Sequence, residues 1–110
     1  ESKMENLTMA QIMNNMPKVF HADRAADVDA DIQFVFTGDE PGSWVLGVHN
    51  GEATMREGQA ETPTATLETP SQVWKGVLTG QTNPMTAFMT GQIKATGDMG
   101  LLMRLQTMFG

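Results

Sequence analysis

The sequence predicts an α+β fold in which a five-stranded, mostly antiparallel sheet is covered on one face by helices. Hydrophobic and polar residues alternate from Asp27 onward with the period of two that is typical of half-buried strands. Asn50-Gly51 lies between two strand-like runs and favours a two-residue hairpin turn. Hairpins followed by two helices, a returning strand and a last helix indicate one sheet with helices on one face. The 110 residues fit a single domain, 1–110.

The N-terminal part of the chain predicts one short helix. Residues 1–6 are polar, and we expect them to form a flexible tail. Thr8 and Gln11 have the spacing of a capping box, in which each side chain bonds the other residue's backbone N–H. Pro17 lacks an N–H and should end or kink this helix. The apolar stripe of the helix consists of Met9, Ile12, Met13 and Met16.

Four strands are expected next, at 27–36, 43–49, 52–57 and 64–69. In the first, the apolar positions Val28, Ala30, Ile32, Phe34 and Phe36 should face the core. Asp27, Asp29, Asp31 and Gln33 should face water. In the second strand, the core positions are Trp44, Leu46 and Val48.

Helix signals dominate after the fourth strand. Thr69 is expected to cap a helix that has Pro70 at its first position and ends at Gly80. Asn83-Pro84 repeats the same start signal for a short helix.

The remaining signals complete the order of elements. Gly91 should stop the short helix, and 92–96 should form the fifth strand. Asp98 should then cap the last helix.

The segment from Pro84 to Phe109 has an excess of apolar residues. Five of the ten methionines lie in it, and Lys94, Asp98 and Arg104 are its only charged residues. The last helix is apolar over most of its circumference, whereas a surface helix normally shows a narrower stripe. Such a helix is either buried in the core on most sides, or it faces something apolar outside the chain, which would be a ligand in a cavity or another protein.

Several classes of function lack support in the sequence. A net charge of −6 argues against nucleic-acid binding and limits membrane contact to a transient one. The acidic run 27–31 fails as an EF-hand loop, because Ile32 and Gly38 replace the required glycine and glutamate. His21 and His49 have no recognisable catalytic partner, and there are no cysteines. We therefore expect no enzyme activity, no metal and no cofactor.

Three segments of the sequence carry a family resemblance. Residues 87–101 read Ala-Phe-Met-Thr-Gly-Gln-Ile-Lys-Ala-Thr-Gly-Asp-Met-Gly-Leu, and 80–84 read Gly-Gln-Thr-Asn-Pro. Residues 32–42 read Ile-Gln-Phe-Val-Phe-Thr-Gly-Asp-Glu-Pro-Gly. Together with the hairpin at 50–51, they resemble the sterol carrier protein type 2 domain family, in order and from about Met9 to the end.

The resemblance implies a hydrophobic tunnel between the sheet and its helices, which binds a fatty acid, fatty acyl-CoA, phospholipid or sterol without catalysis. It also implies that the last helix borders the tunnel, at Met99, Leu102, Met103 and Met108. The acidic charge disfavours acyl-CoA. Because Met108-Phe109-Gly110 matches no peroxisomal targeting tripeptide, we expect a cytoplasmic protein.

These inferences lead to one expected site and one main function, a carrier for an apolar lipid, either monomeric or homodimeric. The alternative is a protein-interaction or dimerisation module that uses the C-terminal helix as its interface. Gln106 or Arg104 would orient a head group at the tunnel mouth. The expected ligand-binding residues are Phe34, Phe36, Trp44, Trp74, Phe88, Met89, Leu102, Met103 and Gln106.

Overall fold

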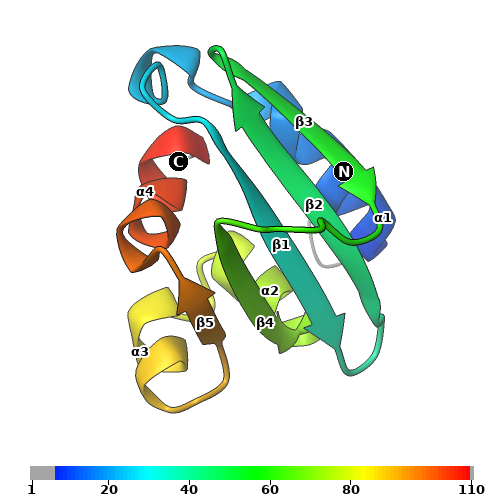
Figure 1. Cartoon of the computed structure of the whole chain (residues 1–110). Helices are drawn as coiled ribbons and strands as arrows, with labels where there is room; N and C mark the ends of the chain where they lie inside the picture. The colour runs from blue at the N-terminus through cyan, green and yellow to red at the C-terminus, as the bar shows by residue number, and fades with distance from the viewer. Residues whose placement is uncertain (1–6, 110) are drawn as a thin grey trace.

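The structure is a computed structural model that describes residues 7–109, apart from the side chains of Gln106 and Phe109. The tail expected over 1–6 lies outside the described residues. Within residues 7–109, five strands form one sheet, and four α-helices and two 3-10 helices accompany it (Figure 1). The elements in chain order are α1 (Met9–Asn15), η2 (Met16–Val19), η3 (Ala22–Arg24), β1 (Ala30–Thr37), β2 (Gly42–His49), β3 (Glu52–Glu57), β4 (Ala65–Pro70), α2 (Ser71–Leu78), α3 (Pro84–Met89), β5 (Lys94–Gly97) and α4 (Met99–Phe109).

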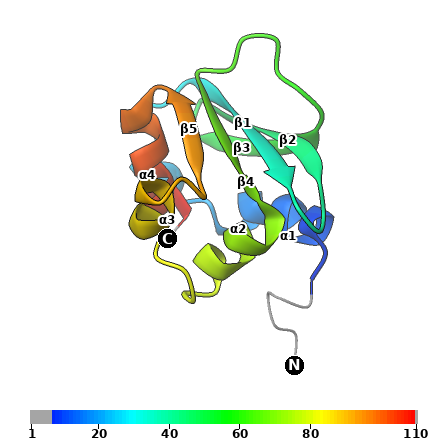
Figure 2. The same ribbon diagram turned by 90° about the horizontal axis from the view of Figure 1, so that it is seen from below.

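The sheet has the strand order β3-β2-β1-β4-β5. The pairs β1–β2, β2–β3 and β4–β5 are antiparallel, and β1–β4 is parallel. The helices lie on one side of the sheet (Figure 2). The predicted α+β architecture is therefore confirmed.

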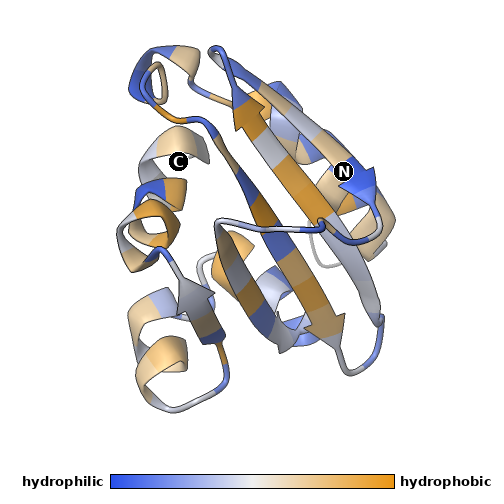
Figure 3. Cartoon of the chain, viewed as in Figure 1, coloured by the Kyte–Doolittle hydropathy of each residue, from blue (hydrophilic) through white to orange (hydrophobic). Residues whose placement is uncertain are grey.

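Alternation and turn chemistry explain the central hairpins. Ile32 and Phe34 are fully buried on the helix side of β1, as predicted from the period of two. Asn50 and Gly51 have positive φ angles of 54° and 76°, which the tight β2–β3 hairpin requires. Figure 3 shows the hydrophobic residues concentrated along β1 and β2. The core thus lies between these central strands and the helices.

The prediction for Gln33 was wrong, because this side chain is buried rather than in water. The connection from β3 to β4 crosses the face of the sheet that the helices leave open (Figures 1 and 2). Gln33 Nε2 donates to the carbonyls of Trp44 and Gly58 at 3.1 and 3.0 Å, and its Oε1 accepts from Ala60 N at 2.8 Å. Gln33 therefore anchors the crossing segment, and all its hydrogen-bonding groups are used.

The predicted start of α2 was wrong by one residue. Thr69 belongs to β4, where it pairs with Phe36 and is buried, and the ladder continues to Pro70. Pro70 occupies the N-cap position without a side-chain cap. Strand pairing with β1 has therefore overridden the local capping signal.

Other local start signals were confirmed. Thr8 and Gln11 form the capping box of α1. The Asn83 side chain accepts from two backbone N–H groups at the start of α3, and Asp98 accepts from Leu101 N at 3.1 Å. These caps satisfy N–H groups that have no partner inside the helix.

The strand β5 begins two residues later than predicted. The backbone N–H groups of Gln92 and Ile93 both donate to Ala87 O, at 2.8 and 3.1 Å, so these two residues complete the end of α3. Within the described residues, no helix is both long and apolar enough to span a bilayer.

Candidate functional site

An aromatic cluster lies between the sheet and α2. The ring centroid of Trp74 on α2 is 5.4 Å from that of Phe34 and 6.1 Å from that of Phe36. Trp44 lies directly opposite Phe34 on the neighbouring strand, and all four aromatic residues are buried. Because alternate residues of a strand share a face, β1 presents both its phenylalanines to the helix layer. We define these four residues as the aromatic cluster.

The helix α4 contributes a second apolar wall. Leu101, Leu105 and Met108 are buried in the same core, and Leu102 is half-buried against it. Their spacing of three, four and seven residues places them on one helical face. This face closes the core beside the aromatic cluster.

Polar contacts fasten α4 to the segment before β1. Arg104 donates to the two carboxylate oxygens of Asp27 at 3.0 and 2.8 Å, and also to Arg24 O at 3.0 Å. The same hydrogen bonds hold the pKa of the Asp27 carboxyl below its ordinary value. Arg24 Nη1 donates to Thr107 O at 3.1 Å, and His21 N donates to Met108 O at 2.8 Å. We call this set of contacts the α4 clasp.

The outer sides of α3 and α4 expose apolar side chains. The exposed fraction reaches 78% for Met89 and 66% for Met103. Single exposed apolar residues are normal, but five of them on two consecutive helices indicate an interaction or ligand-binding surface. We define the Met/Phe surface as the exposed residues Met85, Phe88, Met89, Met99 and Met103.

The structure divides the expected ligand-binding residues into two groups. It brings Phe34, Phe36, Trp44 and Trp74 together in the core, with Leu102 at its edge. It places Phe88, Met89 and Met103 at the surface. The side chain of Gln106 lies outside the described residues. The aromatic cluster is closely packed, so the tunnel and its full wall stay predictions.

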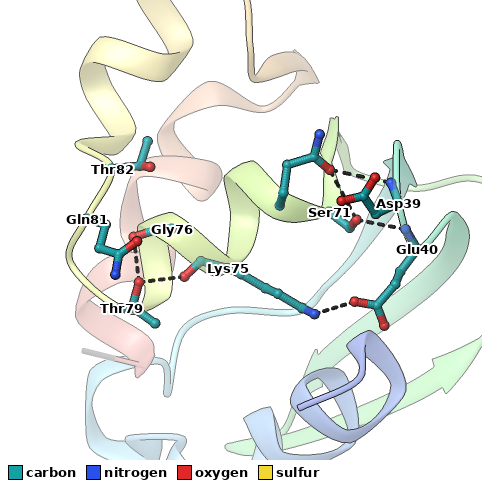
Figure 4. Close-up of a pocket in the computed structure, with 9 residues that line it drawn as sticks. Asp39, Glu40, Ser71, Lys75, Gly76, Thr79, Gln81 and Thr82 are labelled. Atoms are coloured by element: carbon teal, nitrogen blue, oxygen red, sulfur yellow. Dashed lines mark hydrogen bonds and ion pairs between the residues drawn. The ribbon is translucent and has the colours of Figure 1, made fainter. Parts of the chain in front are cut away.

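A polar hollow of about 310 Å³ lies on the other side of α2 (Figure 4). Lys75 forms an ion pair with Glu40 at its edge, and this contact holds the pKa of Glu40 below its ordinary value. Glu40 also accepts from Met9 N at 3.0 Å, so it joins α1 to α2. The sequence did not reveal this hollow because its lining comes from a turn and a helix about thirty residues apart. Its lining is polar and does not suit an apolar chain: Asp39, Glu40, Ser71, Gln72, Lys75, Gly76, Thr79, Gln81 and Thr82.

His49 forms a separate charged cluster at the β2–β3 hairpin. Its two ring nitrogens contact Asp29 and Asp31, the latter at 2.8 Å. Hydrogen bonds to Asp31 and then to Asp29 raise the pKa of His49. The His49 ring is exposed. Among residues 7–109, no group of three or more His, Cys, Asp or Glu side chains is arranged to hold a metal ion.

The fold and the core define an α+β domain with an apolar layer between one sheet and its helices. The family model described as the SCP-2 sterol transfer family matches residues 12–110 of the chain. The chain therefore belongs to this family, and the predicted resemblance is confirmed.

Two curated relatives illustrate the family. The chain is 35% identical over 79 residues to hydroxysteroid dehydrogenase-like protein 2 of Xenopus tropicalis, a match that covers 71% of the chain and 19% of the relative. It is 32% identical over 71 residues to sterol carrier protein 2 of Homo sapiens, which covers 64% of the chain and 13% of the relative. The chain thus spans a small part of the curated relatives that it matches.

Solved structures share the fold. The sterol carrier protein domain 2 of Helicoverpa armigera has a TM-score of 0.69 and 26% identity, with 88% of the chain and 79% of that structure covered. The sec-alkylsulfatase Pisa1 from Pseudomonas sp. has a TM-score of 0.80 and 22% identity, with 96% of the chain but 16% of that structure covered. The same fold therefore occurs both in small proteins and as a fraction of a larger enzyme chain.

Proposed function

We propose that this domain is a non-catalytic carrier that holds one apolar lipid between the sheet and the helices. The observation that carries the proposal is the family match over residues 12–110, combined with an apolar layer bounded by the aromatic cluster and α4. The candidate lipids are a fatty acid, a phospholipid or a sterol. Burial of the acyl or ring carbons would drive binding, at about 0.8 kcal/mol per methylene.

The helices α3 and α4 are the movable wall in this proposal. The single buried residue of α3 is Ala87, whereas its larger apolar side chains Met85, Phe88 and Met89 are exposed. An outward shift of α3 and α4 would widen the space next to Phe34 and Trp74. The Met/Phe surface would then meet the lipid during entry, since flexible methionines adapt to apolar guests of varied shape.

A transient contact with a lipid surface fits the distribution of charge. Residues 84–109 carry two cations and one anion, whereas the whole chain has a net charge of −6. The Met/Phe surface therefore lies on a segment that an anionic membrane would not repel. A cytoplasmic location and a monomeric or homodimeric state complete the proposal. Any activity of a longer protein that contains this domain would come from its other segments.

Native mass spectrometry of the protein purified from cells, followed by organic extraction, tests the proposal. We expect one lipid per chain and saturable uptake of a fluorescent fatty acid or sterol. Met103→Arg should weaken this uptake, whereas Val19→Arg is the matched control, because Val19 is a similarly exposed apolar residue outside the Met/Phe surface. A protein that has no bound lipid and takes up none of the probes would refute the carrier function.

The exposed Met/Phe surface also favours a second candidate, a protein-interaction or dimerisation module. Light scattering over a range of concentrations separates the two functions. The interaction module would be favoured if the molecular mass doubles as the protein concentration rises, if Met103→Arg prevents this doubling, and if the protein takes up no lipid.

A further inference from the structure

The indole nitrogen of Trp74 is a buried hydrogen-bond donor without a partner. Trp74 is 7% exposed, and its Nε1 is the buried side-chain nitrogen or oxygen that remains unsatisfied among the described residues. An indole N–H can only donate. Its burial loses a hydrogen bond to water that nothing in the described chain replaces. The unsatisfied donor therefore marks a place where an acceptor is missing.

Other buried polar groups in the described residues have partners. Gln33 uses both ends of its amide, and Ser71 Oγ, three residues before Trp74, accepts from Glu40 N at 3.0 Å. Ring packing against Phe34 and Phe36 does not by itself require the donor, because aromatic rings without an N–H make the same kind of contact. The N–H thus needs a role other than packing.

The surroundings of Trp74 restrict the chemistry of the missing acceptor. Its ring lies against two phenylalanines, in the layer where the lipid is proposed to bind. The adjacent Lys75 is engaged with Glu40 at the polar hollow (Figure 4). A buried carboxylate needs a cation or several donors, whereas a hydroxyl, ketone or ester oxygen is satisfied by one.

We propose that Trp74 Nε1 donates a hydrogen bond to an uncharged oxygen of the bound lipid, and that it selects such lipids over ionised fatty acids and plain hydrocarbons. This inference rests on the proposed carrier function and adds a residue that determines ligand specificity. Burial of apolar carbons provides most of the affinity, and Trp74 distinguishes lipids that have an uncharged oxygen from those that do not.

Nuclear magnetic resonance of the two indole N–H groups tests the inference on the wild-type chain. The signals of Trp44 and Trp74 are assigned with Trp44→Phe, and three probes with the same chain length are added: dodecanol, dodecanoate and dodecane. We expect dodecanol to move the Trp74 indole proton downfield and to slow its exchange with solvent. Dodecane has no acceptor, so it should leave the Trp74 N–H without a hydrogen bond. A Trp74 signal that is already slow to exchange without lipid, and that dodecanol does not move, would overturn the inference.

Binding measurements with Trp74→Phe give an independent test. This variant keeps an aromatic side chain but removes the N–H together with the rest of the indole, so dodecanol should bind about tenfold more weakly while the affinity for dodecane changes less than about twofold. Trp44→Phe is the matched control and should preserve the ratio between the two probes. An equal loss of affinity for all three probes, or for dodecanol and dodecanoate, would overturn the proposed selection of uncharged oxygens. A wild-type chain that binds none of the probes would instead refute the carrier function itself.

Discussion

Arg104 on α4 donates two hydrogen bonds to the carboxylate of Asp27, 77 residues earlier in the chain, at 3.0 and 2.8 Å. The guanidinium also reaches Arg24 O at 3.0 Å. Bidentate pairs of this kind fix geometry more firmly than a single contact does. The pair therefore ties the last helix to the turn that precedes β1. This is the connection that must loosen if α4 moves to admit a lipid.

Asp27→Asn should accelerate lipid exchange. It removes the ion pair of the α4 clasp but leaves the core intact, so we expect the uptake rate of a fluorescent fatty acid to rise by about two- to fivefold, the range set by a weak exposed pair. Stopped-flow fluorescence measures this rate. Asp23→Asn, at an exposed acid of η3, is the control.

Lowering the pH should also accelerate lipid exchange, as Asp27→Asn does. Because the pKa of Asp27 is lowered in the folded state, the clasp contributes fully above the ordinary aspartate pKa of 3.8. Its contribution is lost as the pH falls through the lower, folded pKa. An exchange rate that is the same in wild type and Asp27→Asn at neutral pH would contradict a gating role.

Gln33→Leu should destabilise the fold strongly. The substitution leaves Gly58 O and Ala60 N without the partners that hold the crossing segment. We expect the free energy of unfolding to fall by about 2–4 kcal/mol, since each buried group left unpaired costs about 1–3 kcal/mol. Urea denaturation followed by circular dichroism measures it. The exposed Gln59 lies in the same segment, and Gln59→Leu should be nearly neutral.

Gly97→Ala should lower the free energy of unfolding more than Gly51→Ala does, although both glycines have positive φ angles, of 88° and 76°. A Cβ at residue 97 would lie 2.5 Å from Thr64 O and 2.8 Å from Ala65 Cα, whereas a Cβ at residue 51 would meet nothing within 4 Å. Gly51→Ala should therefore cost only the backbone term of about 1–2 kcal/mol. Gly97→Ala should exceed this cost in thermal or urea unfolding. Equal costs would show that β5 can move away from β4 freely.

His49 should make stability depend weakly on pH. Its pKa is raised in the folded state, so the stabilisation is fully present below the ordinary histidine pKa of 6.5 and is lost as the pH rises through the higher, folded value. The effect should be small because the ring is exposed.

Two variants separate the causes of that shift. Asp31→Asn should lower the His49 pKa more than Asp29→Asn does, since the hydrogen bond to Asp31 contributes most. Titration of the His49 ring signals by nuclear magnetic resonance measures both pKa values. The opposite ranking would contradict the paired geometry described above.

Local signals in the sequence predicted most of the fold. The bounds of β3, the caps at Asn83 and Asp98, and the buried face of β1 agree with the structure because each depends on residues close in sequence. The predicted positions of Gln33 and Thr69 failed for the opposite reason. The first is buried by the crossing segment, and the second by pairing with β1.

The sequence by itself determined the strands and helices, the family, and an apolar excess in residues 84–109, because periodicity, capping and composition are local properties. Only the tertiary structure decided how that excess is divided. Leu101, Leu105 and Met108 turn inward because their side of α4 meets the sheet, whereas Met89 and Met103 stay outside. The tertiary structure alone also placed an unsatisfied Trp74 N–H within the apolar layer, since no local pattern records which donors lack a partner.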